Sequence, residues 1–160
     1  IPGLDRIWPA EQAMVNLDRI GQNVVIIGGG LVGCELAEAL AGKGRNVTIV
    51  EMLGDILVGM ELLNRRGEIL KICDMGVWIL IQSKVNGAEN GTHLVIFKVR
   101  TTALPYDDVI NATGYIRNQD LEQRLAAEGL KVLAIGDAVS PGKIYNATQA
   151  GVEVVNRLMD

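Results

Sequence analysis

The sequence predicts an α/β fold, in which a parallel sheet is flanked by helices and continued by an antiparallel β-meander. Short apolar, β-branched runs at residues 24–27 and 47–50 enclose a helical apolar pattern, which is typical of two parallel strands joined by a helix. Between residues 83 and 100 apolar and polar residues alternate instead, and Asn90-Gly91 in the middle of that stretch predicts a hairpin. The 19 glycines among 160 residues exceed the usual share of roughly 7% and indicate several tight turns or close backbone contacts.

The first strand and helix follow a short opening segment. Residues 1–20 are predicted to form a lead-in, in which Pro9 opens a short helix because proline suits the first turn of a helix. Residues 24–27 follow as a buried strand and residues 31–43 as a helix with one apolar face. Gly44 is predicted to end this helix, since glycine commonly lies just past a helix C-terminus.

The next elements repeat the alternation of strand and helix. Residues 47–50 are predicted to form the second buried strand, residues 60–75 a second helix ended by Gly76, and residues 77–81 a third buried strand. The predicted apolar face of the second helix consists of Leu62, Leu63, Ile69, Leu70 and Ile72.

After the meander the chain is predicted to return to strands. Residues 108–112 are predicted to form one strand and residues 132–135 a last, buried strand, and residues 152–159 are predicted to form a closing helix. Because the chain starts at Ile1 instead of a methionine and ends within a helical pattern, we expect it to be a fragment of a longer polypeptide.

Composition and charge argue against binding to nucleic acid or to a membrane. Apolar residues make up 49% and charged residues 21%, the ordinary balance of a globular domain, and the net charge of −4 gives no basic surface for nucleic acid. No apolar run approaches the roughly 18 residues of a membrane-spanning helix, and no secretory signal opens the chain. We therefore expect no nucleic-acid or membrane partner and a cytoplasmic location.

The cysteines, the histidine and Glu35 do not indicate a catalytic or metal site. Cys34 and Cys73 show neither a CxxC motif nor the spacing of metal ligands, so they are expected to be two buried thiols that act as small apolar residues. His93, the single histidine, is expected to be a solvated strand residue. Glu35 either complements the positive end of its helix or contacts a cofactor, and the sequence leaves both roles open. No catalytic residue and no metal ligand is predicted in this chain.

The glycine-rich turn is the strongest functional signal. The run GGGLVG matches GxGxxG, follows a predicted strand and opens a predicted helix, the context in which this motif binds a dinucleotide. Gly28 is expected to make the tight turn, Gly30 to let the backbone approach a pyrophosphate, and Gly33 to let the helix pack close to the strand. The backbone N–H groups of Leu31 and Val32 would face the phosphates at the positive helix end. The candidate binding residues of this turn are Gly28, Gly29, Gly30, Leu31, Val32 and Gly33.

A carboxylate follows the second predicted strand at the distance that this motif requires. Glu51 lies about 20 residues beyond the glycines, where it would accept hydrogen bonds from an adenosine ribose. Met52, also a candidate site residue, is followed by leucine and glycine, with no arginine for a 2′-phosphate, which favours NAD(H) over NADP(H). Two alternatives stay open: a purely structural glycine turn beside an unrelated glutamate, and a methyltransferase that binds S-adenosylmethionine, although that class as a rule lacks the third glycine.

Three markers in order resemble a known superfamily. The glycine turn is followed by Asn-Ala-Thr-Gly at residues 111–114 and by Ala-Ile-Gly-Asp at residues 134–137. Together with the meander they resemble the pyridine nucleotide-disulfide-reductase-like flavoproteins, which have a Rossmann-like NAD(P)H domain inserted into an FAD domain. The resemblance implies that the Ala-Thr-Gly turn lies near the nicotinamide, where the chain crosses between domains, and that the Gly-Asp pair meets the flavin ribityl–phosphate region. The site residues that it adds are Ala112, Thr113, Gly114, Gly136 and Asp137.

The stretch AIGDAVSPGKIYNATQAG, residues 134–151, is most similar to NADH:flavin oxidoreductases related to dienoyl-CoA reductase and trimethylamine dehydrogenase. In these enzymes the dinucleotide-binding region follows a barrel that carries FMN and an iron–sulfur cluster. The resemblance implies an NAD(H)-binding domain at residues 21–118 and, at residues 119–160, a return segment of the FAD-binding half. One departure is Arg117 before Asn118, where such proteins usually carry proline before asparagine.

The implied function is the NADH-binding portion of a flavin-dependent oxidoreductase that passes hydride from NADH to flavin. FAD would be bound in the full-length protein, and FMN and the iron–sulfur cluster would lie outside this chain. The rest of its own polypeptide is the expected partner, and the fragment alone is expected to be inactive because the first, FAD-binding glycine fingerprint is missing from it. The alternative is a non-catalytic nucleotide-binding or structural module that keeps the fold.

Overall fold

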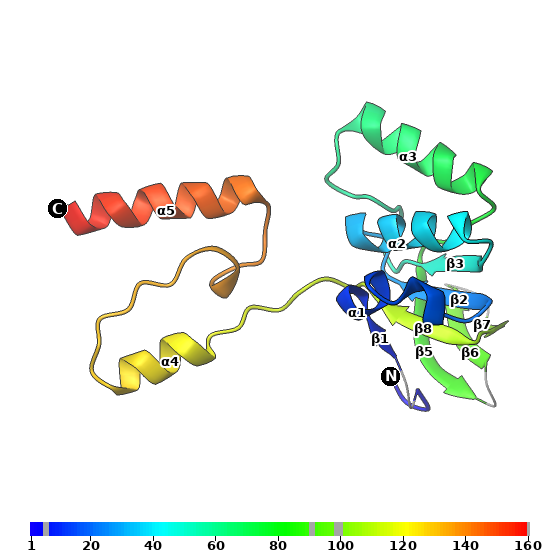
Figure 1. Ribbon diagram of the computed structural model, residues 1–160, viewed down its shortest axis with the longest axis horizontal. Helices are drawn as coiled ribbons and strands as arrows, with labels where there is room; N and C mark the ends of the chain where they lie inside the picture. Colours follow the sequence, from blue (N-terminus) through cyan, green and yellow to red (C-terminus); the bar gives the residue numbers. More distant parts are fainter. Residues whose placement is uncertain (5–6, 90–91, 98–100, 160) are drawn as a thin grey trace. The chain divides into compact units, whose positions relative to one another are not determined.

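The computed structural model describes residues 1–4, 7–89, 92–97 and 101–159 (Figure 1). The chain divides into two compact units, residues 1–114 and residues 115–160. The first unit holds a sheet of five parallel strands, in the order β1-β8-β2-β3-β4, and an antiparallel sheet in the order β5-β6-β7. The predicted α/β fold with a parallel sheet and a meander is therefore confirmed.

The parallel sheet is built from five short strands. Their bounds are Trp8–Pro9 for β1, Asn23–Ile27 for β2, Asn46–Val50 for β3, Trp78–Leu80 for β4 and Asp108–Asn111 for β8. The helices of this unit are α1 (Ala10–Met14), the 3-10 turn η1 (Leu17–Arg19), α2 (Leu31–Gly42) and α3 (Leu62–Asp74). The meander consists of β5 (Ser83–Glu89), β6 (Thr92–Phe97) and β7 (Thr101–Pro105).

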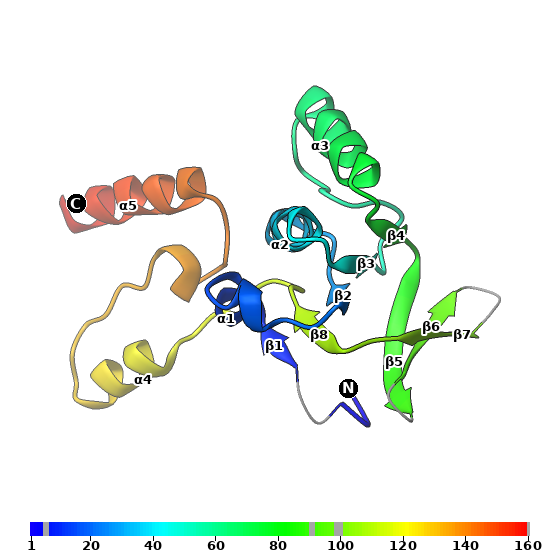
Figure 2. The same cartoon turned by 45° about the vertical axis from the view of Figure 1, so that its right-hand side comes forward.

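The two faces of the parallel sheet bury different side chains. Val24 and Ile26 of β2 point into the larger core, which also contains Leu36 of α2. Val25, the residue between them, packs with Val50 and Val85 in a smaller core beneath the antiparallel sheet. This alternation follows from the two-residue period of a strand and places α1 and α2 on one face and the meander on the other, as Figures 1 and 2 show.

The opening segment is part of the sheet. Trp8 pairs with Ile110 in parallel register, and the side chains of Ala13 and Ile20 are buried. The carboxylate of Asp108 accepts hydrogen bonds from Trp8 Nε1 and from the Gly21 backbone, both at 2.7 Å. The predicted short helix after Pro9 is confirmed as α1, with Pro9 at its N-cap.

Most predicted elements of the first unit are confirmed within a residue or two. Gly44 and Gly76 follow α2 and α3 with φ of +77° and +81°, the left-handed conformation in which glycine ends helices. The predicted Asn90-Gly91 turn lies outside the described residues, although the flanking strands pair with Glu89 opposite Thr92.

The apolar set of α3 is covered only in part, and one prediction of burial in this unit was wrong. In α3 only Ile72 is buried, whereas Leu62, Leu63 and Leu70 are exposed. At 100° per residue the predicted apolar set spans roughly half of the helix circumference, and the fold covers only one edge of it. The strand at 77–81 was expected to be buried, but Trp78 is 71% exposed because β4 is the edge strand of its sheet.

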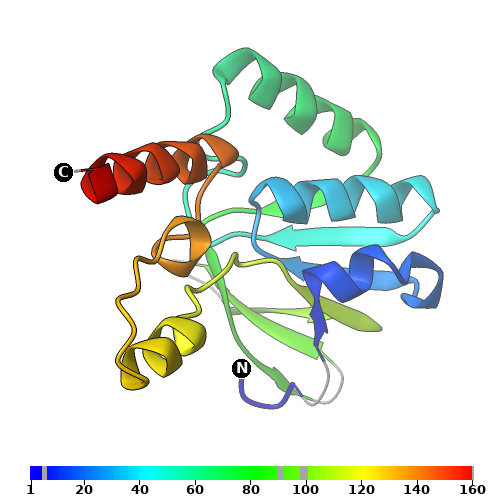
Figure 3. The same ribbon diagram turned by 60° about the vertical axis from the view of Figure 1, so that its left-hand side comes forward.

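The second unit contains α4 (Asp120–Ala127), the 3-10 turn η2 (Gly136–Ala138) and α5 (Ile144–Met159), the elements coloured yellow to red in Figure 3. The closing helix predicted at 152–159 thus begins eight residues earlier. The buried strand predicted at 132–135 is wrong: these residues form no strand, and Leu133 and Ile135 are exposed. A strand requires a neighbour for its backbone hydrogen bonds, and the described residues of this unit form no other strand. Among the described helices of the chain, none combines the length and the apolar character needed to cross a membrane.

Candidate functional site

The glycine turn connects β2 to α2, and its glycines differ in their surroundings. Gly28 has a φ of +108°, and a Cβ atom added to it would overlap the backbone of Ala112. A Cβ on Gly33 would overlap the carbonyl oxygen of Gly28. Gly30 has an ordinary extended backbone, and a Cβ there would meet nothing within 4 Å. The first two glycines are therefore required by the fold, whereas the fold leaves the space above Gly30 free.

The N-terminus of α2 is open to an anion. Gly30 occupies the N-cap position, where it has no side chain to accept hydrogen bonds from the first helical turn. Among the described residues none accepts a hydrogen bond from the backbone N–H groups of Leu31 and Val32. Unpaired donors at the positive end of a helix favour a negatively charged group.

Gly29, between these two glycines, is held at both of its backbone groups. Its N–H donates to Glu51 Oε2 at 2.7 Å, and its carbonyl oxygen accepts from the Leu57 backbone at 2.7 Å. The other carboxylate oxygen of Glu51 accepts from the Leu53 backbone at 2.7 Å, and the residue is only 9% exposed. Glu51, predicted as a ribose acceptor, thus also fixes the turn. Each carboxylate oxygen has a second acceptor position.

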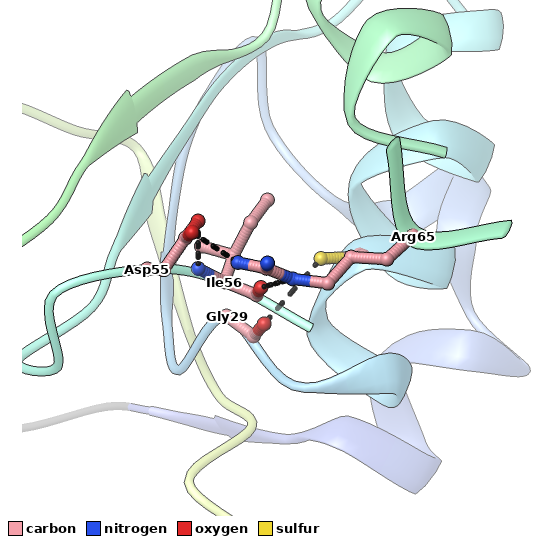
Figure 4. A network of polar contacts seen from close by, with 5 residues as sticks. Gly29, Asp55, Ile56 and Arg65 are labelled. Atoms are coloured by element: carbon pink, nitrogen blue, oxygen red, sulfur yellow. Dashed lines mark hydrogen bonds and ion pairs between the residues drawn. The ribbon is translucent and has the colours of Figure 1, made fainter. Parts of the chain in front are cut away.

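The segment between β3 and α3 covers the inner side of the turn. Ile56 is buried, and its side chain lies where a Cβ on Gly29 would be. Figure 4 shows Arg65 of α3 reaching this segment: its Nε donates to the Ile56 carbonyl oxygen at 2.8 Å, and its Nη2 forms an ion pair with Asp55. Sequence analysis missed these residues because no motif marks them and Arg65 lies in a helix 36 residues beyond Gly29.

The stretch after β8 lies beside the glycine turn. β8 and β3 flank β2 on opposite sides, so the carboxyl ends of all three strands meet at one edge of the sheet. The Ala112 backbone donates to the Ile27 carbonyl oxygen at 2.8 Å. Asn111 Oδ1 accepts from Thr113 Oγ1 at 2.8 Å, and Gly114 has a φ of +98°. The strand order changes direction at β2: the chain continues from β2 to β3 on one side, whereas β8 on the other side comes much later in the sequence. Open α/β sheets bind ligands at such a switch point.

The remaining predicted site residues are Met52, Gly136 and Asp137. Met52 is 69% exposed. Gly136 and Asp137 belong to the second unit, which is described by itself: Gly136 has a φ of +62°, and Asp137 Oδ1 accepts from the Gly142 backbone at 3.2 Å. Glu35 is exposed on α2.

The two cysteines have different environments. Cys34 is buried, its thiol donates to the Gly29 carbonyl oxygen at 3.6 Å, and burial raises the pKa of this thiol to about 12. Cys73 is exposed, so the expectation of two buried thiols was wrong for it; it lies on α3, which is covered along one edge only. No three metal-ligating side chains gather among the described residues. His93 pairs with Leu104 in the meander, and its side chain lies outside what is described.

These features define the class of protein. A parallel sheet, a glycine turn that opens a helix and a carboxylate at the next strand end are the marks of a dinucleotide-binding α/β domain. The chain belongs to the pyridine nucleotide-disulphide oxidoreductase family, whose sequence profile matches residues 4–151. This family consists of flavin-dependent NAD(P)H oxidoreductases, and NAD(H) and FAD are the cofactors that membership implies.

Two relatives are similar over almost the whole chain. An NADH oxidase of Thermoanaerobacter brockii is 35% identical over 149 residues, which cover 92% of this chain and 23% of the relative. A cinnamate reductase of Clostridium sporogenes is 30% identical over 161 residues, which cover 99% of this chain and 24% of the relative. The chain therefore spans about a quarter of the length of these proteins.

Solved structures share the fold. Histamine dehydrogenase from Rhizobium sp. 4-9 superposes with a TM-score of 0.84 at 22% identity, over 96% of this chain and 26% of that one. A 2-naphthoyl-CoA reductase gives a TM-score of 0.74 at 20% identity, over 94% and 24% of the two chains. The resemblance stated from the sequence is confirmed, and the methyltransferase alternative is not supported.

Proposed function

We propose that the first unit binds NADH as part of a larger flavin-dependent oxidoreductase that passes hydride from NADH to flavin. The observation that carries this proposal is the free space above Gly30 next to the unpaired N–H groups of Leu31 and Val32. A pyrophosphate needs both features, an uncrowded backbone and donors at a helix N-terminus.

Two groups of residues in this chain would contact the two ends of the dinucleotide, the adenosine and the nicotinamide. Glu51 would accept hydrogen bonds from the adenosine ribose, with Met52 on the exposed rim. Ala112, Thr113 and Gly114 would line the nicotinamide side, because the strand before them is the neighbour of β2. When bound, the nicotinamide supplies the hydride and the flavin accepts it. The task of this chain is to hold and orient the nucleotide, and none of its residues is assigned as an acid, base or nucleophile.

The second unit would complete an FAD site with the rest of the polypeptide. Gly136 and Asp137 are the residues assigned to it, within a return segment at residues 119–160 that follows an NAD(H)-binding domain at residues 21–118. FMN and an iron–sulfur cluster would belong to regions outside this chain, as in the dienoyl-CoA reductase-like enzymes. The similarity to an NADH oxidase and a cinnamate reductase, of which this chain spans about a quarter, supports a place in a larger oxidoreductase.

The test is the affinity of the 160-residue chain for NADH, measured by calorimetry with Gly30→Val. A valine side chain would occupy the space of the phosphate, so NADH binding should be lost while the circular dichroism spectrum is unchanged. Gly67→Val is the matched control, because Gly67 also has nothing within 4 Å of an added Cβ but lies on α3. Equal NADH affinity in Gly30→Val and the wild type would show that the turn is only structural.

A further inference from the structure

We propose that Arg65 is a positioning residue for the dinucleotide site, and that it acts through the segment that fixes Gly29. This inference rests on the proposed function, because it concerns the same glycine turn. Arg65 lies on α3, and its side-chain hydrogen bond and ion pair are with Ile56 and Asp55, which lie outside the turn. Its effect is transmitted by Asp55, Ile56 and Leu57.

The first step is the interaction of Arg65 with the segment. Its Nε donates a hydrogen bond to the Ile56 carbonyl oxygen at 2.8 Å, and its Nη2 forms an ion pair with the carboxylate of Asp55 (Figure 4). The Arg65 side chain is 19% exposed, whereas that of Asp55 is 54% exposed. The Asp55 carboxylate also accepts a hydrogen bond from the backbone N–H of Ile56 at 2.9 Å. The N–H and the carbonyl oxygen of Ile56 are therefore both held, the first by Asp55 and the second by Arg65.

The second step leads from the segment to the turn. Ile56 is buried against Gly29, and Leu57 donates its backbone N–H to the Gly29 carbonyl oxygen at 2.7 Å. Leu57 has a φ of +53°, a strained conformation for a residue with a side chain, which persists only where the surroundings impose it. Arg65 is one of the groups that impose it. Without that interaction, the segment is free to leave the strained conformation and release the carbonyl of Gly29.

The third step is the consequence for binding. Gly29 precedes Gly30, the residue whose backbone must approach the phosphates, and a shift of its peptide plane would redirect the donors that follow. Glu51 holds only the N–H side of Gly29. On the carbonyl side the Leu57 backbone donates at 2.7 Å and the Cys34 thiol at 3.6 Å, and a thiol is a weak donor. Loss of the Leu57 hydrogen bond would therefore leave the carbonyl of Gly29 only weakly held.

Lysine cannot replace arginine here. A guanidinium presents several donors in a planar fork, whereas an ammonium group is a single point. Arg65→Lys therefore keeps the charge but cannot reach the Ile56 carbonyl and the Asp55 carboxylate with the same geometry. Asp55→Asn is a second, milder variant, because it removes the charge of an exposed carboxylate and leaves Arg65 in place.

The experiment measures dissociation constants of the 160-residue chain for NADH and ADP-ribose, with Arg66→Lys as the matched control. Arg66 is the next residue of α3, has the same charge and is exposed. We expect both ligands to bind about tenfold more weakly to Arg65→Lys, the loss of roughly one hydrogen bond, and to lose affinity in Asp55→Asn as well. Amide exchange at Leu57 should accelerate in the same variants. Arg66→Lys should match the wild type in every measurement.

The outcomes separate this inference from the proposed function. If the wild type binds NADH and Arg65→Lys binds it equally well below its unfolding temperature, Arg65 only stabilises the fold and the inference is wrong. If Leu57 exchange is unchanged in Asp55→Asn while affinity falls, the transmission through the segment is wrong. If the wild type binds neither NADH nor ADP-ribose, the proposed function fails, and accelerated Leu57 exchange in Arg65→Lys would still show the interaction of Arg65 with the segment.

Discussion

The helices α2 and α3 follow neighbouring strands and both carry apolar side chains, but one is largely covered and the other largely exposed. In α2 the side chains of Cys34, Leu36 and Leu40 are buried, whereas in α3 those of Leu63 and Leu70 are exposed. The reason is position: α2 lies over the strands at the centre of the sheet, while α3 follows the strand next to the edge (Figure 2). An apolar pattern therefore records which face of a helix can be buried, and the neighbours decide how much of it is.

The N-termini of the two helices differ in the same way. The α3 helix is capped by Glu61, whose carboxylate accepts from the Leu63 and Asn64 backbones at 3.0 Å. These donors lower the pKa of that carboxyl. The α2 helix has a glycine in the capping position and no side-chain acceptor. A capped terminus is satisfied by its own chain, whereas the uncapped terminus of α2 can take an external anion.

The largest expected difference between the two helices is in thiol reactivity. At pH 8 a thiol reagent should modify Cys73 rapidly and Cys34 hardly at all, because burial excludes the reagent and raises the Cys34 pKa to about 12. The raised pKa alone lowers the thiolate fraction about a thousandfold relative to an unperturbed thiol. Counting modified thiols with a chromogenic disulfide should give one in the native protein and two after unfolding. Two fast thiols in the native protein would contradict the buried position of Cys34.

The next effect is on stability. Leu36→Ala should lower the free energy of unfolding by about 2–5 kcal/mol, because it leaves a cavity in the larger core. Leu63→Ala, the same change on α3, should alter it by less than about 0.5 kcal/mol, since Leu63 is 76% exposed. Denaturant unfolding of both variants measures the difference. Equal losses would mean that α3 is covered in solution by something outside this chain's own fold.

The smallest expected effect is on NADH affinity, and it compares Glu51, which binds the turn before α2, with Glu61, which caps α3. Glu51→Ala should weaken NADH binding roughly ten- to a hundredfold, because this is the affinity that one hydrogen bond to a charged group contributes. It should also reduce the preference for NADH over NADPH, because the carboxylate repels a 2′-phosphate. Glu61→Ala, which uncaps α3, should leave both dissociation constants unchanged. A Glu51→Ala variant that keeps the full NADH preference would refute the assignment of Glu51 to the ribose.

Arg65 bears on this last prediction. An arginine near the ribose would attract the 2′-phosphate of NADPH and reduce the preference for NADH. In the structure the guanidinium of Arg65 is occupied by Asp55 and the Ile56 carbonyl, and Arg45 donates to Gln22 at 3.4 Å. We therefore assign the proposed preference for NADH to Glu51.

The sequence by itself determined the parts that depend on local pattern. The strand–turn–helix context of the glycines, the left-handed glycines after α2 and α3 and the meander follow from period, turn chemistry and backbone sterics, which act within a few residues. The motif spacing also named Glu51, because strand and helix lengths fix where the second strand ends. The family resemblance came from the same short stretches.

Only the tertiary structure decided which residues contact one another and which side chains are exposed. Glu51 binds the glycine turn itself, and Arg65 holds the segment beside it, because residues far apart in sequence meet at one edge of the sheet. The exposure of Trp78 and Cys73 depends on the order of strands, which no local pattern specifies. Residues 132–135 carry the pattern of a buried strand and form none, since backbone pairing requires a neighbouring strand, and their own sequence cannot supply one.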